Sequence, residues 1–379
     1  MIYFDNAATG GRKPDTVLNA VQSAIKVCAN PGRSGHKLSL ACAKLVQDCR
    51  YALNEFFDGD GFERVCFTKN CTEALNIAIL GVLKKGDHVV VGCTEHNSVL
   101  RPLEALRKAG VITYDVCPLQ GSVYLGEGNI FAEEIEKRIT PKTRLVAVTT
   151  ASNVTGCIPD LAKIKNILPK NVLFLCDGAQ GGGHLQIKMK GAGIDLLTIA
   201  GHKGMLGIQG SGALLFSDRV ELSPIFYGGT GSMSLSLEMP DFYPDALEAG
   251  TLSFPAILSL LEGVRYLSVH KKHLQSRLLM LTAYFLKGLQ ALNGYDVYSK
   301  ANPCGIVAFS HPRFSSEQLA DLLSERYDIA VRGGFHCAPL MHRALGTDEN
   351  GLVRVSFSHF NSEREIDVLL NALTDLKHA

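Results

Sequence analysis

The sequence predicts an α/β protein in which a large, mostly parallel sheet wrapped by helices is followed by a smaller α+β unit. Short runs rich in Val, Ile and Leu alternate with helical segments along the first two thirds of the chain, and this order is typical of parallel strands joined by helical crossovers. The length also points to two units, because 379 residues exceed the usual size of one hydrophobic core.

Each element of the large unit is predicted from its local pattern. Short apolar runs with β-branched residues indicate strands at residues 64–67, 89–91, 111–116, 145–149, 172–176 and 195–200. Apolar residues at helical spacing indicate helices at residues 71–80, 99–108, 131–138 and 161–168.

The smaller unit begins with a long helical pattern that starts near residue 252 and runs to residue 292. Strands at residues 306–309 and 353–357 follow, together with helices at residues 316–327 and 363–376. We therefore expect a large domain over residues 1–251 and a small domain over residues 252–379, with residues 1–15 packing against the small one.

The composition agrees with an enzyme of the cytoplasm. Hydrophobic residues make up 46% of the chain and charged residues 20%, so a sizeable core can form. The net charge of +1 at pH 7 gives no indication of nucleic acid or an acidic surface as a partner. The N-terminus has no basic region before a long apolar run, and no apolar stretch reaches the length of a membrane span. We expect no membrane partner.

Eleven cysteines are scattered along the chain without a Cys-x-x-Cys pair, which favours neither a disulfide framework nor a metal site. Most of them lie in apolar runs, where a free thiol packs as a small hydrophobic residue. Cys337 differs, because it lies in a glycine-rich loop with Arg332 and His336. Such a loop favours a thiolate. Arg332 and His336 either lower the pKa of this thiol or simply pack the loop.

Lys203 is the strongest candidate for covalent chemistry. It follows the predicted strand at residues 195–200, and Asp177 ends the strand at residues 172–176. Since two such strands can deliver both residues to one sheet edge, the lysine amine can form a Schiff base with pyridoxal 5'-phosphate while the carboxylate pairs with the ring nitrogen. A surface lysine and a helix-capping aspartate are the simpler interpretations of each residue alone, but the joint pattern favours the cofactor.

Other segments converge on the same ligand. Residues 68–73 place Cys71 and Thr72 at a helix N-terminus, where free N–H groups favour a phosphate. His202 can add a phosphate hydrogen bond, and His96, after the strand at residues 89–91, can stack on an aromatic cofactor. An ordinary helix cap and two loop histidines are the plainer alternatives.

With these residues in view, the chain resembles the class V aminotransferase-like family of fold-type I pyridoxal-phosphate enzymes, and within it the cysteine desulfurases and selenocysteine lyases. The matching motifs run nearly end to end, at residues 5–9, 30–36, 68–73, 95–97, 152–156, 177–180, 201–203, 248–251, 332–338 and 354. The resemblance implies a seven-stranded, mostly parallel sheet, a homodimer, and pyridoxal 5'-phosphate as cofactor.

The resemblance also implies a role for each matching residue. Four would hold the ring of the cofactor: Lys203 through its amine, Asp177 at the ring nitrogen, His96 by stacking and Gln180 at the phenolic oxygen. Four would bind phosphate: Cys71, Thr72, His202 and, reaching the partner subunit's cofactor, Thr251. Four would bind the substrate, L-cysteine: Asn153, Arg354, His36 and Arg332. Cys337 would accept the sulfur.

Three alternatives stay open. A selenocysteine lyase would use the same Lys203, Asp177 and Arg354, an aminotransferase or epimerase would need no reactive thiol, and a non-catalytic scaffold would keep the fold only to bind a partner. The short interval between Cys337 and Arg354 is similar to that of relatives that mobilise sulfur for iron–sulfur cluster assembly, and it favours a dedicated acceptor protein. Ala200 and Phe335 depart from the family pattern, since many relatives have polar residues there.

Overall fold

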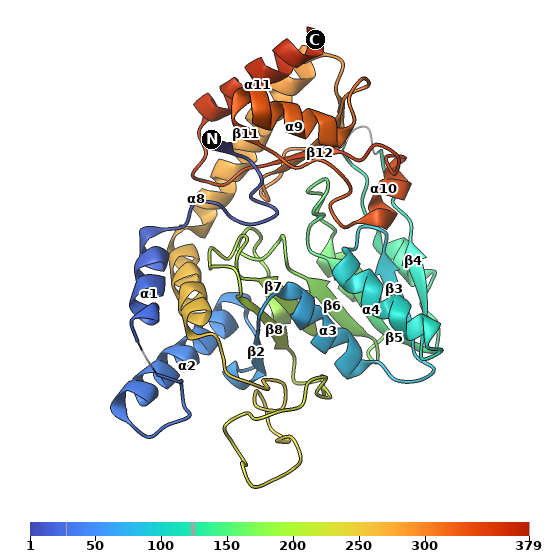
Figure 1. The fold of residues 1–379 in the computed structure, drawn as a ribbon. Coiled ribbons are helices and arrows are strands. Elements are labelled where there is room, and N and C mark those ends of the chain that lie inside the picture. Colours follow the sequence, from blue (N-terminus) through green and yellow to red (C-terminus); the bar gives the residue numbers. More distant parts are fainter. Residues whose placement is uncertain (28, 123–125, 379) are drawn as a thin grey trace.

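A seven-stranded sheet forms the centre of the large unit in the computed structural model, which describes residues 1–27, 29–122 and 126–378 (Figure 1). Its strands are β2 (Val65–Thr68), β3 (His88–Gly92), β4 (Thr113–Cys117), β5 (Thr143–Thr149), β6 (Leu173–Asp177), β7 (Leu196–Ala200) and β8 (Gly212–Phe216). Their order is β2-β8-β7-β6-β5-β3-β4. Strand β8 runs antiparallel to both neighbours, and the remaining pairs are parallel. The predicted α/β fold with a mostly parallel seven-stranded sheet is confirmed.

Helices cover both faces of this sheet. They are α1 (Asp15–Ile25), α2 (Lys37–Phe57), α3 (Cys71–Val82), α4 (Asn97–Lys108), α5 (Ala132–Glu136), α6 (Leu161–Ile167) and α7 (Met189–Ala192), with a 3-10 turn at Phe62–Arg64. Successive side chains of β6 point to opposite faces. Leu173 and Leu175 pack with α3 and α4, whereas Phe174 and Cys176 pack with α2 and α6. Burial on both faces explains why the strands are nearly continuous apolar runs in the sequence.

One helix, α8 (Phe254–Leu292), is shared by the two units. Its apolar residues up to Leu274 belong to the core of the large unit, and those from Leu278 onward belong to the core of the small unit. The helical pattern predicted from residue 252 to residue 292 is therefore one 39-residue helix. Neither α8 nor another described helix has a stretch apolar enough, over a sufficient length, to cross a membrane.

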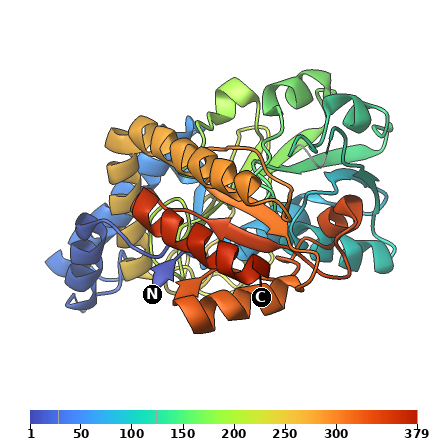
Figure 2. The same cartoon turned by 90° about the horizontal axis from the view of Figure 1, so that it is seen from above.

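The small unit contains a three-stranded antiparallel sheet and its helices. Its elements are β9 (Asp296–Val297), β10 (Ile306–Ser310), α9 (Ser316–Tyr327), β11 (Ile329–Ala330), α10 (Pro339–Leu345), β12 (Val353–Ser356) and α11 (Glu363–His378). Figure 2 shows α11 between α9 and the second half of α8.

The first residues of the chain join the small unit to the large one. Strand β1 (Ile2–Tyr3) pairs in parallel with β11, and Phe4 packs edge to face on Phe357 in the small core. A few residues later the backbone N–H of Gly10 donates to the carbonyl of His202 at 2.9 Å in the large unit.

A long stretch without helix or strand, residues 217–253, projects from the base of the large unit in Figure 1. Its middle part, residues 226–242, is here called the apolar loop. The large apolar side chains that it exposes are Phe226, Tyr227, Met233, Leu235, Leu237 and Phe242. An exposed apolar surface of this kind typically marks a place where another protein binds.

A buried ion pair links three elements at the base of the large unit. Both terminal nitrogens of Arg50 in α2 donate to the two carboxylate oxygens of Glu248, at 2.9 and 2.6 Å, and each side chain is 6% exposed. Glu248 also accepts from the backbone N–H of Phe67 in β2 at 2.6 Å, and the guanidinium lies over the Phe67 ring. The pair thus joins α2, β2 and the segment before α8.

Glu248→Gln should lower the free energy of unfolding by about 3–5 kcal/mol, because Arg50 would keep its charge in a buried place without a carboxylate. A urea titration followed by circular dichroism measures the change. Glu262→Gln is the matched control, since Glu262 pairs with the more exposed Arg265 and such a pair contributes about 0–1 kcal/mol. Equal effects of the two substitutions would contradict the anchoring role of Glu248.

Candidate active site

Most of the predicted site residues line one cavity at the carboxyl edge of the large sheet. The lining residues are Asn70, Cys71, Thr72, Leu75, His96, Ser98, Thr149, Asn153, Asp177, Ala179, Gln180, Ala200, His202 and Lys203. They lie at or just after the ends of β2, β3, β5, β6 and β7. In an open α/β sheet this edge is where ligands bind.

Asp177 is the last residue of β6, and its side chain is buried. Its Oδ1 accepts from the backbone N–H of Ala179 at 2.9 Å and lies 3.4 Å from the Cys71 thiol, which can donate to it. Parallel pairing aligns Asp177 with Thr149 of β5 on one side and with Thr198 of β7 on the other. The carboxylate is therefore held in one place at the floor of the cavity.

Lys203 follows β7 and lines the same cavity. Burial lowers the pKa of Lys203; Arg354 and Arg332 lower it further, whereas Asp177 and Cys71 raise it. A lowered pKa increases the share of the neutral amine, which is the nucleophilic form of a lysine.

Glycines on both sides of Lys203 allow its loop to pack closely on its neighbours. A Cβ at Gly204 would lie 2.4 Å from the carbonyl oxygen of Gly182, and one at Gly201 would lie 2.1 Å from Oγ of Ser211. A side chain at either position would push the backbone apart. Gly204 thus keeps the loop of Lys203 against the loop that follows Asp177, and Gly201 keeps it against Ser211 before β8.

His96 caps α4 as a neutral ring. Its Nδ1 accepts from the backbone N–H of Ser98 at 3.1 Å, so the ring carries its proton on Nε2, and burial lowers the pKa of His96. The preceding residue, Glu95, is fully buried and accepts from the backbone N–H of Thr149 at 2.8 Å. Burial raises the pKa of Glu95 well above its ordinary value. The Glu95 side chain therefore joins the turn after β3 to the end of β5.

The N-terminus of α3 borders the cavity at Cys71 and Thr72. Asn70 caps the helix by accepting from the backbone N–H of Glu73 at 2.9 Å, and the first N–H groups of a helix have no partner within it. The hydroxyl of Thr72 lies 2.8 Å from that of Ser98. These N–H and O–H donors together suit a phosphate.

His202 lies between the cavity and the N-terminal segment. Its Nδ1 is 3.0 Å from the hydroxyl of Thr9, and its carbonyl accepts from the amine of Lys13 at 2.9 Å. Burial lowers the pKa of His202 to about 4 and that of Lys13 to about 8. Neither Thr9 nor Lys13 was predicted from the sequence as a neighbour of the site.

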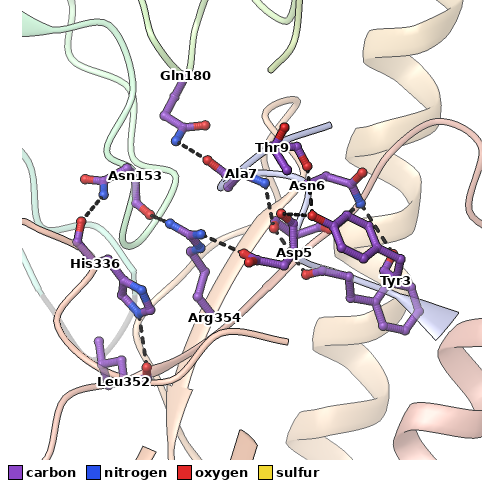
Figure 3. A network of polar contacts seen from close by, with 12 residues as sticks. Tyr3, Asp5, Asn6, Ala7, Thr9, Asn153, Gln180, His336, Leu352 and Arg354 are labelled. Atoms are coloured by element: carbon purple, nitrogen blue, oxygen red, sulfur yellow. Dashed lines mark hydrogen bonds and ion pairs between the residues drawn. The ribbon is translucent and has the colours of Figure 1, made fainter. Parts of the chain in front are cut away.

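Gln180 points toward the N-terminal segment in Figure 3, where its Nε2 donates to the carbonyl of Ala7 at 3.0 Å. The N–H of Ala7 in turn donates to the hydroxyl of Ser356 in β12 at 2.9 Å. The amide of Gln180 therefore has a protein partner of its own, and its contact with a cofactor oxygen stays a prediction.

Asn153 and Arg354, two of the residues predicted to bind substrate, contact each other (Figure 3). Nη1 of Arg354 donates to the carbonyl of Asn153 at 2.9 Å. Nη2 pairs with Oδ1 of Asp5 at 2.9 Å. Asn153 lines the cavity, whereas Arg354 is only 1% exposed. The guanidinium thus has a carboxylate partner that the sequence analysis did not predict.

The loop that carries Cys337 is bonded to the turn after β3. The carbonyl of Cys337 accepts from the backbone N–H of Asn97, next to His96, at 2.8 Å. Nδ2 of Asn153 donates to the carbonyl of His336 at 2.6 Å. His336 and Cys337 have φ angles of 48° and 57°, a left-handed conformation that is uncommon outside glycine. Among the cysteines that the structure describes, Cys337 is the exposed one.

Of the two roles considered for His336, the structure favours packing of the loop. Its Nε2 donates to the carbonyl of Leu352 at 3.0 Å, and its ring is 2% exposed. Burial lowers the pKa of His336 well below its ordinary value, and a neutral ring brings no positive charge to the neighbouring thiol. Arg332 is half-buried and forms a backbone bridge with Arg354.

Five predicted site residues do not line the cavity: Arg332, Cys337 and Arg354, described above, and also His36 and Thr251. His36 is exposed and caps α2, its Nδ1 accepting from the backbone N–H of Ser39 at 3.2 Å. Thr251 lines a second pocket, at the base of the large unit, with Phe226 of the apolar loop and Glu248. The predicted roles, substrate binding for His36 and contact with the partner subunit's cofactor for Thr251, stay predictions.

The cavity also contains residues to which the sequence analysis assigned no role. They are Asn70, Leu75, Ser98, Thr149 and Ala179. Ser98 comes soon after His96, and Asn70 directly precedes Cys71. Their position just after the strands β3 and β2 could have indicated that they line the site. No such signal pointed to Asp5 as a partner of Arg354, because 349 positions separate them in the sequence.

The chain is similar over nearly its whole length to proteins of one family. The model of the family described as Aminotransferase class-V matches residues 2–369. Probable cysteine desulfurases from Methanothermobacter thermautotrophicus and Pyrococcus abyssi are each 32% identical to it, over 99% of this chain and 94% of the relative. The apo structure of a cysteine desulfurase from Thermococcus onnurineus matches with a TM-score of 0.88 at 30% identity. The crystal structure of an Escherichia coli cysteine desulfurase in an S-sulfonic acid form matches with a TM-score of 0.87 at 25% identity. Each match covers 99% of this chain and 94% of the solved one.

The buried histidines predict a stability that declines in mild acid. Burial lowers the pKa of His202 and His359 to about 4 and that of His336 well below its ordinary value. In the unfolded chain these groups return to about 6.5. Between pH 6.5 and pH 4 the unfolded chain therefore binds more protons than the folded one, and stability is lost as the pH falls through this interval.

Thermal melting at pH 7.5, 6 and 5 measures this loss as a falling melting temperature. His359→Gln should reduce the dependence on pH, because it removes one group that the unfolded chain protonates. A melting temperature that stays constant from pH 7.5 to 5 would contradict the prediction.

Proposed function

Because the chain belongs to the aminotransferase class-V family, in its cysteine desulfurase branch, we propose that it removes sulfur from L-cysteine, releasing L-alanine and leaving a persulfide on Cys337. The observation that carries this proposal is the position of an exposed thiol next to the cavity. The Cys337 loop is bonded to Asn97, the neighbour of His96, and His96 lines the cavity with Lys203 and Asp177.

The residues of the cavity fit pyridoxal 5'-phosphate. Donors at Cys71, Thr72 and Ser98 suit its phosphate. Asp177 suits its ring nitrogen, and the amine of Lys203 suits its aldehyde. When bound, this cofactor withdraws electrons from the carbon atoms of the substrate. Membership of the family supports the same cofactor.

Arg354 is the residue we propose for the carboxylate of the substrate, with Asn153 beside it. A guanidinium is a planar donor group that matches a carboxylate. Among the described residues, nothing accepts a hydrogen bond from Nε of Arg354, although this atom is buried. A buried donor without a partner costs about 1–3 kcal/mol, and a substrate carboxylate would supply the missing acceptor.

The amine of Lys203 is the group best suited to move protons at the α- and β-carbons of the substrate. It lines the cavity, and its lowered pKa brings it nearer to the pH at which it can accept as well as donate a proton. Asp177 stays beside it as a fixed negative charge, held by the N–H of Ala179.

Cys337 would attack the sulfur atom of the substrate as a thiolate. A sulfur–sulfur bond forms, and the bond between that sulfur and the β-carbon breaks. The electron pair of the broken bond stays on the carbon, which takes up a proton and leaves as part of L-alanine. The transferred sulfur remains on Cys337, and the step needs no external oxidant.

The backbone of the Cys337 loop is bonded on several sides, which limits how far the persulfide can travel. The carbonyls of His336 and Cys337 both accept hydrogen bonds, and the carbonyl of Gly334 accepts from the N–H of Leu352 at 3.1 Å. We therefore expect an acceptor protein that comes to the site and takes the sulfur there.

A second copy of the chain is the partner we propose for the base of the large unit. Leu235 and Leu237 of the apolar loop are fully exposed, and Thr251 lines the adjacent pocket. A second subunit that covers these side chains would remove apolar surface from water. Thr251 would then be available to the cavity of the partner.

Lys203→Ala should abolish the visible absorbance of the bound cofactor, because no other lysine lines the cavity in the described part of the chain. Borohydride reduction followed by peptide mass spectrometry should find the cofactor attached to Lys203 in the unmodified protein. Lys13 is the matched comparison, since it is also buried and has a lowered pKa. Finding the cofactor on Lys13 would overturn the assignment of Lys203.

Cys337→Ser tests the proposed function directly. The variant should still bind L-cysteine, seen as a change in the cofactor spectrum, because Lys203 and Arg354 remain. Release of sulfide and L-alanine should fall at least about a hundredfold, since a hydroxyl is a far poorer nucleophile toward sulfur than a thiolate.

Mass spectrometry of the protein after treatment with L-cysteine locates the extra sulfur in the same experiment. Cys157→Ser is the control, because Cys157 is a half-buried cysteine outside the proposed machinery, and it should keep full activity. Normal turnover by Cys337→Ser, with the extra sulfur on another cysteine, would refute the proposal. A rate with L-selenocysteine far above that with L-cysteine would instead favour a selenocysteine lyase.

A further inference from the structure

The buried guanidinium of Arg354 has a carboxylate beside it before any substrate binds. Nη2 pairs with Oδ1 of Asp5 at 2.9 Å, and Nη1 donates to the carbonyl of Asn153 at 2.9 Å (Figure 3). Nε has no partner among the described residues. The guanidinium therefore has a donor left for a second carboxylate, while its charge is already countered by the first.

Asp5 is held in place by contacts other than Arg354. Its carbonyl accepts from the phenol of Tyr3 at 3.1 Å and from the backbone N–H of Ala8 at 3.1 Å. It also forms a β-bridge with Ser356 of β12, the strand that carries Arg354. The carboxylate is thus a fixed neighbour of the guanidinium and not a mobile surface group.

Asp5 offsets part of the positive charge at Arg354. Arg332 lies near enough to act on Arg354 with the same sign, and Asp5 acts with the opposite sign. Within the part of the chain that the structure describes, Asp5 is the carboxylate in ion-pair contact with Arg354. Without Asp5, an incoming carboxylate would face Arg354 and Arg332 with this negative charge removed.

We propose that Asp5 sets the affinity of Arg354 for the α-carboxylate of the amino acid that binds in this site. It is a positioning residue, because it acts through Arg354. It keeps the guanidinium in place and at the same time weakens its attraction for the carboxylates of substrate and product. This inference rests on the proposed function, since it requires Arg354 to bind such a carboxylate.

The physical reason is that two anions share one cation. A carboxylate that accepts from Nε comes close to Asp5, and like charges repel strongly where little water separates them. Without this repulsion, the guanidinium would hold L-cysteine and L-alanine more tightly by similar factors. Tighter binding of both does not speed the chemical step, and it slows the departure of L-alanine.

Asp5→Asn separates charge from position, because the amide keeps an accepting oxygen near Nη2 and removes the negative charge. Isothermal titration of the cofactor-loaded enzyme with L-alanine should show binding at least about fivefold tighter than in the unmodified protein, the lower end of typical coupling between two ligands. KM for L-cysteine should fall in parallel, and kcat should not rise. Loss of a merely structural contact would weaken binding instead.

Asp15→Asn is the matched control, since Asp15 is exposed at the start of α1 and should leave both constants unchanged. Asp5→Ser makes the same change in charge with a smaller side chain and replaces the Asn variant if that one does not fold. Unchanged or weaker binding of L-alanine to a folded Asp5 variant overturns the role of Asp5 alone. An unmodified protein that neither turns over L-cysteine nor binds L-alanine overturns the proposed function, and this inference with it.

Discussion

The parallel pairing of β5, β6 and β7 is the constraint on which the site depends. Thr149 lies opposite Asp177, and Asp177 lies opposite Thr198, so the three strands end at nearly the same level of the sheet. The residues that follow each strand are therefore brought together although they come from different parts of the chain. Strands buried on both faces move little relative to one another. The carboxylate of Asp177 and the amine of Lys203 are therefore kept at a fixed separation.

The small unit contributes the substrate-binding and sulfur-accepting groups proposed for the site. The sheet contributes the groups suited to a cofactor, whereas the guanidinium of Arg354 and the thiol of Cys337 come from β12 and the loop that follows β11. The two units are held in register by α8, which belongs to both cores, and by the first ten residues. A change that lets the units move apart would separate the substrate-binding groups from the cofactor-binding groups without altering either set.

Local sequence patterns were sufficient to predict most strands of the sheet and many of the residues that line the cavity. Parallel strands are apolar throughout, and polar residues directly after them, such as Asp177 and Lys203, stand out against that background. Strand β8 was not predicted, because its five residues follow a glycine-rich run that reads as a loop. Helices α1 and α2 were not predicted either. Local sequence does not show which distant groups surround a side chain. The pairing of Asp5 with Arg354 and the neutral state of His336 both depend on such groups, so they could not be predicted.

The pairing of β1 with β11 also affects how the protein is made. Ile2 lies opposite Ile329, so the segment with Ile2 is synthesised long before its strand partner. Bringing such distant segments together carries a large entropic cost, and contacts of this kind form slowly. The cofactor-binding edge of the sheet is encoded before residue 204, so it can assemble during synthesis. The groups proposed to bind substrate are complete only after β12, which carries Arg354, has been synthesised.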